Sequence, residues 1–365
     1  MTGNLYYNRK AQWAVYIVIF VLLALVPFVF DNPFTLNQFA RYLIFSLTAV
    51  SVSLVWGYGG ILSLGQGIAF GMGAYGMGAT MQMQFQDPEN DPIPTFMLTN
   101  ELETLPTVWE PFWSTPIGLS LAIGIPTLFF LIFGYMMFQA RVAGVFVAIM
   151  TLAMLAAWYS VVYDMQPFTA GFNGISPPNA FEIFGVSIDP YSATAYWICV
   201  AFLIILTLGT KFLLGTKFGL IVQAMRDDPE RARFLGYSVA YYQTVLFTLS
   251  GLIAACAGIL WVMVTQYVSP TSMEIMLSIS MVIWAAVGGR TSLLGAMIGA
   301  ILINLGQSYA GDEFQQHWLI ILGVVFVIVV LFLPKGLAGL FELILGKISG
   351  NNNRTKNETE TGQKA

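Results

Sequence analysis

The chain has 365 residues, of which 57% are hydrophobic and only 9% are charged, with a mean hydropathy of +0.74. Soluble domains rarely exceed about half apolar residues, so this composition indicates a polytopic membrane protein. The net charge of −4 without a basic cluster argues against nucleic acid as a partner, and one histidine with two distant cysteines excludes an ordinary metal site.

Ten apolar runs are candidates for membrane spans. They are 12–30, 39–56, 61–84, 116–138, 143–163, 192–214, 240–267, 273–288, 291–310 and 317–334. Helices are expected because backbone groups in lipid must be hydrogen-bonded internally. The run at 273–288 is short for a crossing, so a full span and a discontinuous or re-entrant helix both stay open. The expected fold class is an all-α integral membrane protein with about ten transmembrane helices.

The distribution of lysine and arginine predicts how these spans are oriented. The segments 86–115 and 164–190 carry acidic residues but no lysine or arginine, which places them outside. Both termini are then cytoplasmic, with 1–11 as the N-terminal segment, 12–340 as the membrane domain and 341–365 as a polar, partly disordered tail. Arg41 is the one basic residue that this arrangement leaves on the outer side.

Glycine is concentrated in "GYGGILSLGQGIAFGMGAYGMG" (57–78), which holds nine glycines. A glycine inside a helix costs about 1 kcal/mol relative to alanine, and nine glycines in one predicted span therefore require a reason. Close packing of helix backbones is one reason, and a broken helix lining a translocation path is another; both can hold. A similar string, "GGRTSLLGAMIGAILIN", occurs at 288–304. The glycines assigned to helix packing are Gly65, Gly67, Gly71, Gly288, Gly289 and Gly295.

The stretch "RDDPERARFLGY" (226–237) lies in the segment 215–238 between the sixth and seventh spans and has six charges in eight residues. Asp228 is a good N-cap, Pro229 suits the first helical position and Gly236 suits a C-cap, so a helix of under two turns is expected. A solvated loop helix and a docking element for a cytoplasmic partner are both compatible with this pattern. The chain has no G-x-x-x-x-G-K-S/T phosphate loop and no carboxylate well inside a span, which favours a partner that supplies energy.

The segment "GLIVQAMRDDPERARFLGY" resembles the cytoplasmic coupling segment of ABC importer permeases of the branched-chain amino acid and urea family. "GGILSLGQGIAFGMGAY", "MVIWAAVGGRTSLLGAMIGAI" and "VLFLPKGLAGL" resemble other segments of that family, from about residue 57 to 340. Within the family, the acidic insertion "FMLTNELETLPTVW" makes the chain most similar to the second permease subunit of urea importers. The 164–190 loop departs from the family's usual double-glycine run.

The resemblance implies the ABC importer permease fold and a transport subunit without enzymatic activity in a bacterial inner membrane. It implies three kinds of partner besides lipid: a homologous second permease, two ATPase subunits that bind ATP and Mg²⁺, and a periplasmic substrate-binding protein. This chain itself is expected to hold no cofactor. The residues implied to couple it to the ATPases are Arg226, Asp227, Asp228, Pro229, Glu230, Arg231 and Arg233.

Urea is the substrate that the resemblance favours, with branched-chain amino acids or short amides as the alternative. A passive urea or ammonium channel is a further alternative of another class, and it would not need a docking helix. A small neutral solute needs a narrow path lined by hydroxyl, amide and backbone groups. Polar residues in or at the edge of spans are the candidates, although each could equally bond a neighbouring helix: Ser63, Gln66, Ser278, Ser280 and Asn304.

Overall fold

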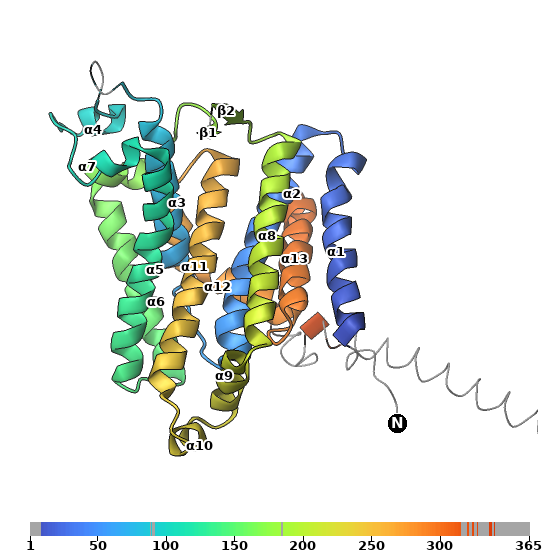
Figure 1. Cartoon of the computed structure of the whole chain (residues 1–365). Coiled ribbons are helices and arrows are strands. Elements are labelled where there is room, and N and C mark those ends of the chain that lie inside the picture. The colour runs from blue at the N-terminus through green and yellow to red at the C-terminus, as the bar shows by residue number, and fades with distance from the viewer. Residues whose placement is uncertain are drawn as a thin grey trace, which may run out of the picture.

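The computed structural model describes residues 9–87, 89, 92–183 and 185–314, with scattered positions as far as 339. The described chain is a bundle of long helices standing side by side (Figure 1). Short helices and a small hairpin lie at one end of the bundle, and two helices, α9 and α10, lie at the other.

Nine helices within the described part of the chain coincide with nine of the ten expected spans. They are α1 (Arg9–Val29), α2 (Pro33–Val52), α3 (Gln66–Met83), α5 (Thr115–Gln139), α6 (Val145–Asp164), α8 (Ala193–Leu214), α11 (Val239–Thr265), α12 (Ile275–Gly288) and α13 (Leu293–Phe314). The tenth expected span, 317–334, falls mostly outside the described residues. By length and composition alone, five of the described helices can cross a membrane, or six if α12 and α13 form one broken span.

Burial separates the helices into a centre and a periphery. In α2 with its continuation, and in α11, 78% and 72% of the most apolar window is buried within the protein. The corresponding share is only 28% in α5, 28% in α6 and 33% in α8, whose remaining apolar side chains face outward. Helix α3 is buried along nearly its whole length against α11 and α5. The bundle therefore has α2, α3 and α11 at its centre.

Two interruptions depart from continuous spans. Helix α2 runs into a π-helix, η2 (Ser53–Tyr58), and the backbone then has no regular structure until α3 begins at Gln66. The expected span at 61–84 is thus wrong at its start, because the glycine-rich residues 59–65 do not form a helix. Helices α12 and α13 are bent by 117° relative to each other at a short break. A discontinuous helix was one of the two alternatives that the sequence left open for 273–288.

The two acidic segments form the end of the bundle that carries the small elements. These are α4 (Thr95–Thr99), η3 (Glu110–Trp113), α7 (Gln166–Thr169), η4 (Gly171–Asn173), β1 (Phe181–Ile183) and β2 (Val186–Ile188). A further short helix, η5 (Pro270–Met273), follows α11 and packs beside α3. Strands β1 and β2 pair antiparallel with Phe181 opposite Ile188, so the described fold is mostly rather than wholly helical. The Gln84 side chain donates to the Glu182 carbonyl at 2.8 Å and joins α3 to this hairpin.

The opposite end of the bundle carries α9 (Lys217–Asp227) and α10 (Pro229–Phe234). Helix α1 begins at this same end (Figure 1). The charged stretch and the acidic segments therefore lie at opposite ends of the molecule, as the asymmetry of lysine and arginine requires.

Candidate functional site

Helix α10 forms through the local signals that the sequence contains. Asp228 has extended backbone angles, φ −153° and ψ 93°, and these end α9. Its carboxylate accepts a hydrogen bond from the Arg231 amide at 3.1 Å, and Pro229 occupies the first helical position. Gly236 has φ +88°, a conformation that glycine adopts without strain. The predicted short helix is present, but residues 226–235 are not one helix, since Arg226 and Asp227 belong to α9.

The charges of this segment pair with one another within the chain. Arg226 contacts Asp227 at 2.9 Å, Arg231 contacts Asp228 at 2.7 Å, and Arg233 pairs with Glu230. The Arg231 side chain is nevertheless 85% exposed. Exposed ion pairs of this kind contribute about 0–1 kcal/mol each, so they shape the surface of α10 more than they stabilise it.

Arg226 reaches toward the bundle. Its guanidinium donates a hydrogen bond to the Gly57 carbonyl at 3.0 Å, and its side chain is only 33% exposed. The Arg226 Cγ atom also lies where a side chain on Gly60 would begin, 2.7 Å from an ideal Cβ. Arg226 thus ties the charged stretch directly to the break between η2 and α3.

The loop between α12 and α13 meets the same break. The Ser53 hydroxyl donates to the Arg290 carbonyl at 2.8 Å, and the Arg290 guanidinium lies 5.0 Å from the centre of the Trp56 ring. An ideal Cβ on Gly57 would be 1.7 Å from the Arg290 carbonyl oxygen, so the two backbones are in direct contact. The two glycine-rich strings of the sequence therefore meet beside Arg226, and we call Ser53, Gly57, Gly60, Arg226 and Arg290 the junction.

Three of the five candidate path residues gather at the other end of the broken segment. Ser278 on α12 donates to the Leu64 carbonyl at 2.7 Å and accepts from the Gly67 amide at 3.2 Å. Ser63 is fully buried, and its hydroxyl accepts from the Gly65 amide at 3.2 Å. These hydroxyls supply the hydrogen bonds that an unwound backbone would otherwise lack.

Gln66, the first residue of α3, joins this group. Its side-chain amide donates to the Ser250 hydroxyl on α11 at 3.2 Å, while its carbonyl oxygen is buried without a hydrogen-bond partner. The two remaining candidates lie elsewhere. Ser280 donates to the Met276 carbonyl of its own helix, and Asn304 donates to Ala300 within α13 and lines a separate cavity.

The glycines assigned to packing lie at close approaches. An added Cβ would meet Thr151 at 3.2 Å from Gly65, Leu155 at 3.2 Å from Gly67 and Met273 at 2.1 Å from Gly71. Gly288 and Gly295 touch through backbone, with the Gly295 oxygen 1.9 Å from an ideal Cβ on Gly288. The Gly289 Cα atom lies 2.5 Å from an ideal Cβ on Gly336, and its φ of +115° ends α12, so this glycine meets a conformational demand as well.

Sequence reasoning missed several residues of the site. Thr151 on α6 accepts a hydrogen bond from the Leu64 amide at 3.0 Å, and Ser250 holds Gln66. At the tip of α10, Phe234 is 90% exposed and Leu235 is 76% exposed. The letters "RFL" at the end of the charged run were a signal for this apolar tip, whereas nothing near Thr151 in the sequence indicates a partner 87 residues away.

The described residues offer no group of three or more histidine, cysteine or acidic side chains that could hold a metal ion. Both Cys199 and Cys256 are buried and free.

The sequence was compared with known protein families and with characterised proteins. Residues 34–330 match the family described as "Branched-chain amino acid transport system / permease component". The chain belongs to this permease family. It is accordingly a multi-pass membrane permease component of a transport system and not a catalytic subunit.

The relatives of this permease include transporters for different solutes. It is 26% identical over 350 residues to the high-affinity branched-chain amino acid transport system permease protein LivM of Escherichia coli, with 88% of this chain and 73% of LivM covered. It is 27% identical over 172 residues to the permease protein LivH of that organism, covering 46% and 54% of the two chains. A shorter match, 31% over 159 residues, covers 41% of this chain and 43% of the fructose import permease protein FrcC of Rhizobium meliloti. No solved structure matches the permease.

Proposed function

We propose that this permease is one membrane subunit of an ATP-driven importer and that α10 docks on a cytoplasmic ATPase subunit. The observation that carries the proposal is the junction, because Arg226, at the end of α9 that leads into α10, is bonded to the broken backbone at the centre of the bundle. The sequence contains no G-x-x-x-x-G-K-S/T phosphate loop, and relatives of the chain are named as components of transport systems. ATP and Mg²⁺ would be held by the partner chains.

The apolar tip of α10 gives the docking surface its affinity. Phe234 and Leu235 are exposed beside paired charges, and burying each in a groove would contribute about 1.5–3 kcal/mol. Arg231, at the exposed face of the same helix, would meet the polar rim of that groove. The charges Asp228, Glu230 and Arg233 hold the shape of the helix while the apolar residues bind.

The route from this surface to the spans runs through short contacts. A displacement of α10 would move Arg226 and, through the Gly57 carbonyl, the end of η2. The same segment leads to Leu64 and Gln66, which are bonded to α12 and α11 through Ser278 and Ser250. This is a means by which closure of the ATPases would switch the bundle between outward and inward openings.

The remaining partners and the location follow from the same function. A second, homologous permease would complete the path, as LivM and LivH of Escherichia coli are both named permease proteins of a high-affinity branched-chain amino acid transport system. A periplasmic binding protein would deliver the solute to the end that carries the acidic segments. We place the protein in a bacterial inner membrane with both termini cytoplasmic.

The substrate class supported best is a branched-chain amino acid. The relative covering most of the chain is named for that transport, whereas urea rests only on the acidic insertion at 86–115. This reverses the preference that the sequence alone suggested. Urea is the competing substrate in the test.

The test is assembly followed by transport. The tagged permease, expressed with its neighbouring transport genes, should co-purify with an ATPase and a second permease, and the complex in proteoliposomes should import leucine only with ATP and binding protein. Import of urea but not leucine would overturn the substrate class. Solute flux through this chain alone, without ATP, would overturn the importer and favour a passive channel.

A further inference from the structure

Arg41 places a guanidinium group within the membrane span formed by α2. It is the ninth residue of α2, about 12 Å along the helix from Pro33 at 1.5 Å per residue. An ionised side chain costs about 2.5–3.5 kcal/mol at the centre of a membrane span and less toward its ends, and such residues mark substrate or ion pathways by default. The arginine therefore requires an account that helix packing does not give.

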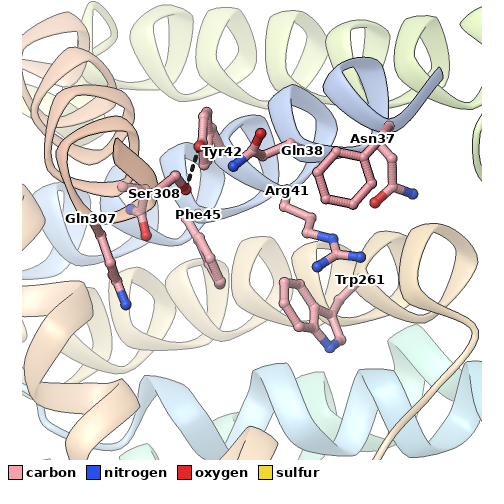
Figure 2. A pocket seen from close by; sticks show the side chains of 10 residues that line it. Asn37, Gln38, Arg41, Tyr42, Phe45, Trp261, Gln307 and Ser308 are labelled. Atoms are coloured by element: carbon pink, nitrogen blue, oxygen red, sulfur yellow. Dashed lines mark hydrogen bonds between the residues drawn. The ribbon is translucent and has the colours of Figure 1, made fainter. Parts of the chain in front are cut away.

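A cavity of about 400 Å³ lies between α2, α11 and α13 and contains this side chain. Its volume is in the range of sites that bind small molecules. Figure 2 shows Arg41 reaching from α2 toward Trp261 on α11, with Gln307 and Ser308 on α13. The lining residues are Phe34, Asn37, Gln38, Arg41, Tyr42, Phe45, Trp261, Asn304, Gln307 and Ser308.

The lining of the cavity gives the guanidinium no counter-ion, because none of the lining residues is acidic. The Arg41 Nε atom is buried without a hydrogen-bond partner. A buried donor left unpaired costs more than one that finds its acceptor, so an anion entering the cavity would bind with a favourable charge-assisted interaction.

The rest of the lining divides into apolar and hydrogen-bonding parts. Phe34, Phe45 and Trp261 offer aromatic surface. Asn304 donates its amide to Ala300, which leaves its side-chain oxygen as an acceptor. Tyr42 is held by its hydrogen bond to Ser308 at 2.5 Å. Together these groups suit a solute with a carboxylate, an apolar side chain and an ammonium group.

We propose that this cavity binds the carboxylate of a small apolar amino acid through Arg41. The inference rests on the proposed import function and names the group on the solute that the permease recognises. Urea has no anionic group, so it could not serve as a counter-ion for the Arg41 guanidinium.

The experiment measures ligand protection of a cysteine placed in the cavity. Gln307 lines the cavity and is exposed, while Cys199 and Cys256 are buried, so Gln307→Cys gives one reactive thiol among the described residues. The full-length variant in phosphatidylcholine nanodiscs is labelled with a maleimide in the presence of L-leucine, isocaproate, L-leucinamide or urea. These probes keep or remove the carboxylate and the ammonium group separately.

The expected result is that leucine and isocaproate slow the labelling, whereas leucinamide and urea require at least about tenfold higher concentration for the same effect. Arg41→Gln added to Gln307→Cys should remove this preference, and Arg41→Lys should retain part of it. Arg141→Gln, which changes an exposed arginine in the turn between α5 and α6, is the matched control and should leave the preference unchanged. The preference is a ratio of the protection by two ligands on the same protein, so it does not depend on how much of each variant is folded.

Equal protection by leucine and leucinamide would overturn the inference, as would a preference that survives Arg41→Gln. Slower labelling in phosphatidylglycerol without any solute would show that Arg41 holds a lipid phosphate instead. Solute-independent protection that appears only when the second permease is bound would show that a partner carboxylate fills the site. Import of leucine by a complex that fails these tests leaves the proposed function standing, and import of urea alone refutes the proposed function separately.

Discussion

Replacing Arg226 with glutamine tests whether the hydrogen bond from Arg226 to Gly57 couples movement of α9 and α10 to the membrane helices. Glutamine keeps Cβ and Cγ, which pack against Gly60, but lacks the guanidinium that reaches the Gly57 carbonyl at 3.0 Å. Hydrogen bonds to charged groups contribute about 1.5–3 kcal/mol, and the lower value applies here because the side chain is one-third exposed. A loss of about 1.5 kcal/mol corresponds to about a tenfold change in the population that moves with α10.

The assay is the number of solute molecules imported per ATP hydrolysed by the assembled importer in proteoliposomes. We expect Arg226→Gln to assemble and to hydrolyse ATP normally while its import falls by about tenfold. The matched control is Asp227→Asn, which removes an exposed ion pair worth about 0–1 kcal/mol and preserves the bond to Gly57.

A wild-type ratio of import to hydrolysis in Arg226→Gln would refute the reasoning. So would an equal fall in Asp227→Asn, because that result would assign the effect to the surface ion pair.

Three further outcomes are expected. Phe234→Ser with Leu235→Ser should abolish co-purification with the ATPase while the membrane bundle keeps its melting temperature, because these side chains are 90% and 76% exposed in the free chain. Gly258→Ala should prevent folding or lower the melting temperature sharply, since its Cβ would lie 1.8 Å from the Phe70 carbonyl oxygen; Gly124→Ala, which meets nothing within 4 Å, should be neutral by the same measurement. An impermeant thiol reagent added to intact cells should label Glu101→Cys but not Phe234→Cys, and the reverse pattern would invert the proposed orientation.

The local features of the coupling segment were predictable because their causes lie within a few residues. Asp228, Pro229 and Gly236 specify where α10 begins and ends through backbone geometry and capping alone. The inward course of Arg226 was not predictable, because its acceptor, Gly57, lies 169 residues away. Charge density in a sequence indicates a special segment but not which of its charges face solvent.

Counting apolar runs predicted the positions of the helices better than their continuity. Helix α3 is almost wholly buried by protein, so its residues need not be as apolar as those that face lipid, and glycine there allows contacts such as Gly71 with Met273. That is why α3 is absent from the described helices that qualify as spans by hydropathy. The irregular stretch 59–65 before it depends on hydrogen bonds from α6 and α12, which a one-dimensional pattern does not contain.

The hydrogen bonds of the polar span residues bear on which of them could line a path. Ser278 bonds both the Leu64 carbonyl and the Gly67 amide, and Ser63 accepts from the Gly65 amide, so their hydroxyls replace helix hydrogen bonds where the backbone is broken. The Ser278 hydroxyl could donate to a solute only by releasing the buried Leu64 carbonyl, which costs about 1–3 kcal/mol. The Ser63 hydroxyl accepts one bond and keeps its hydrogen to donate. The Gln66 side-chain oxygen is buried without a partner, so it can accept a hydrogen bond. Among the polar groups gathered at the break, Ser63 and Gln66 therefore have capacity left for a solute or a water molecule.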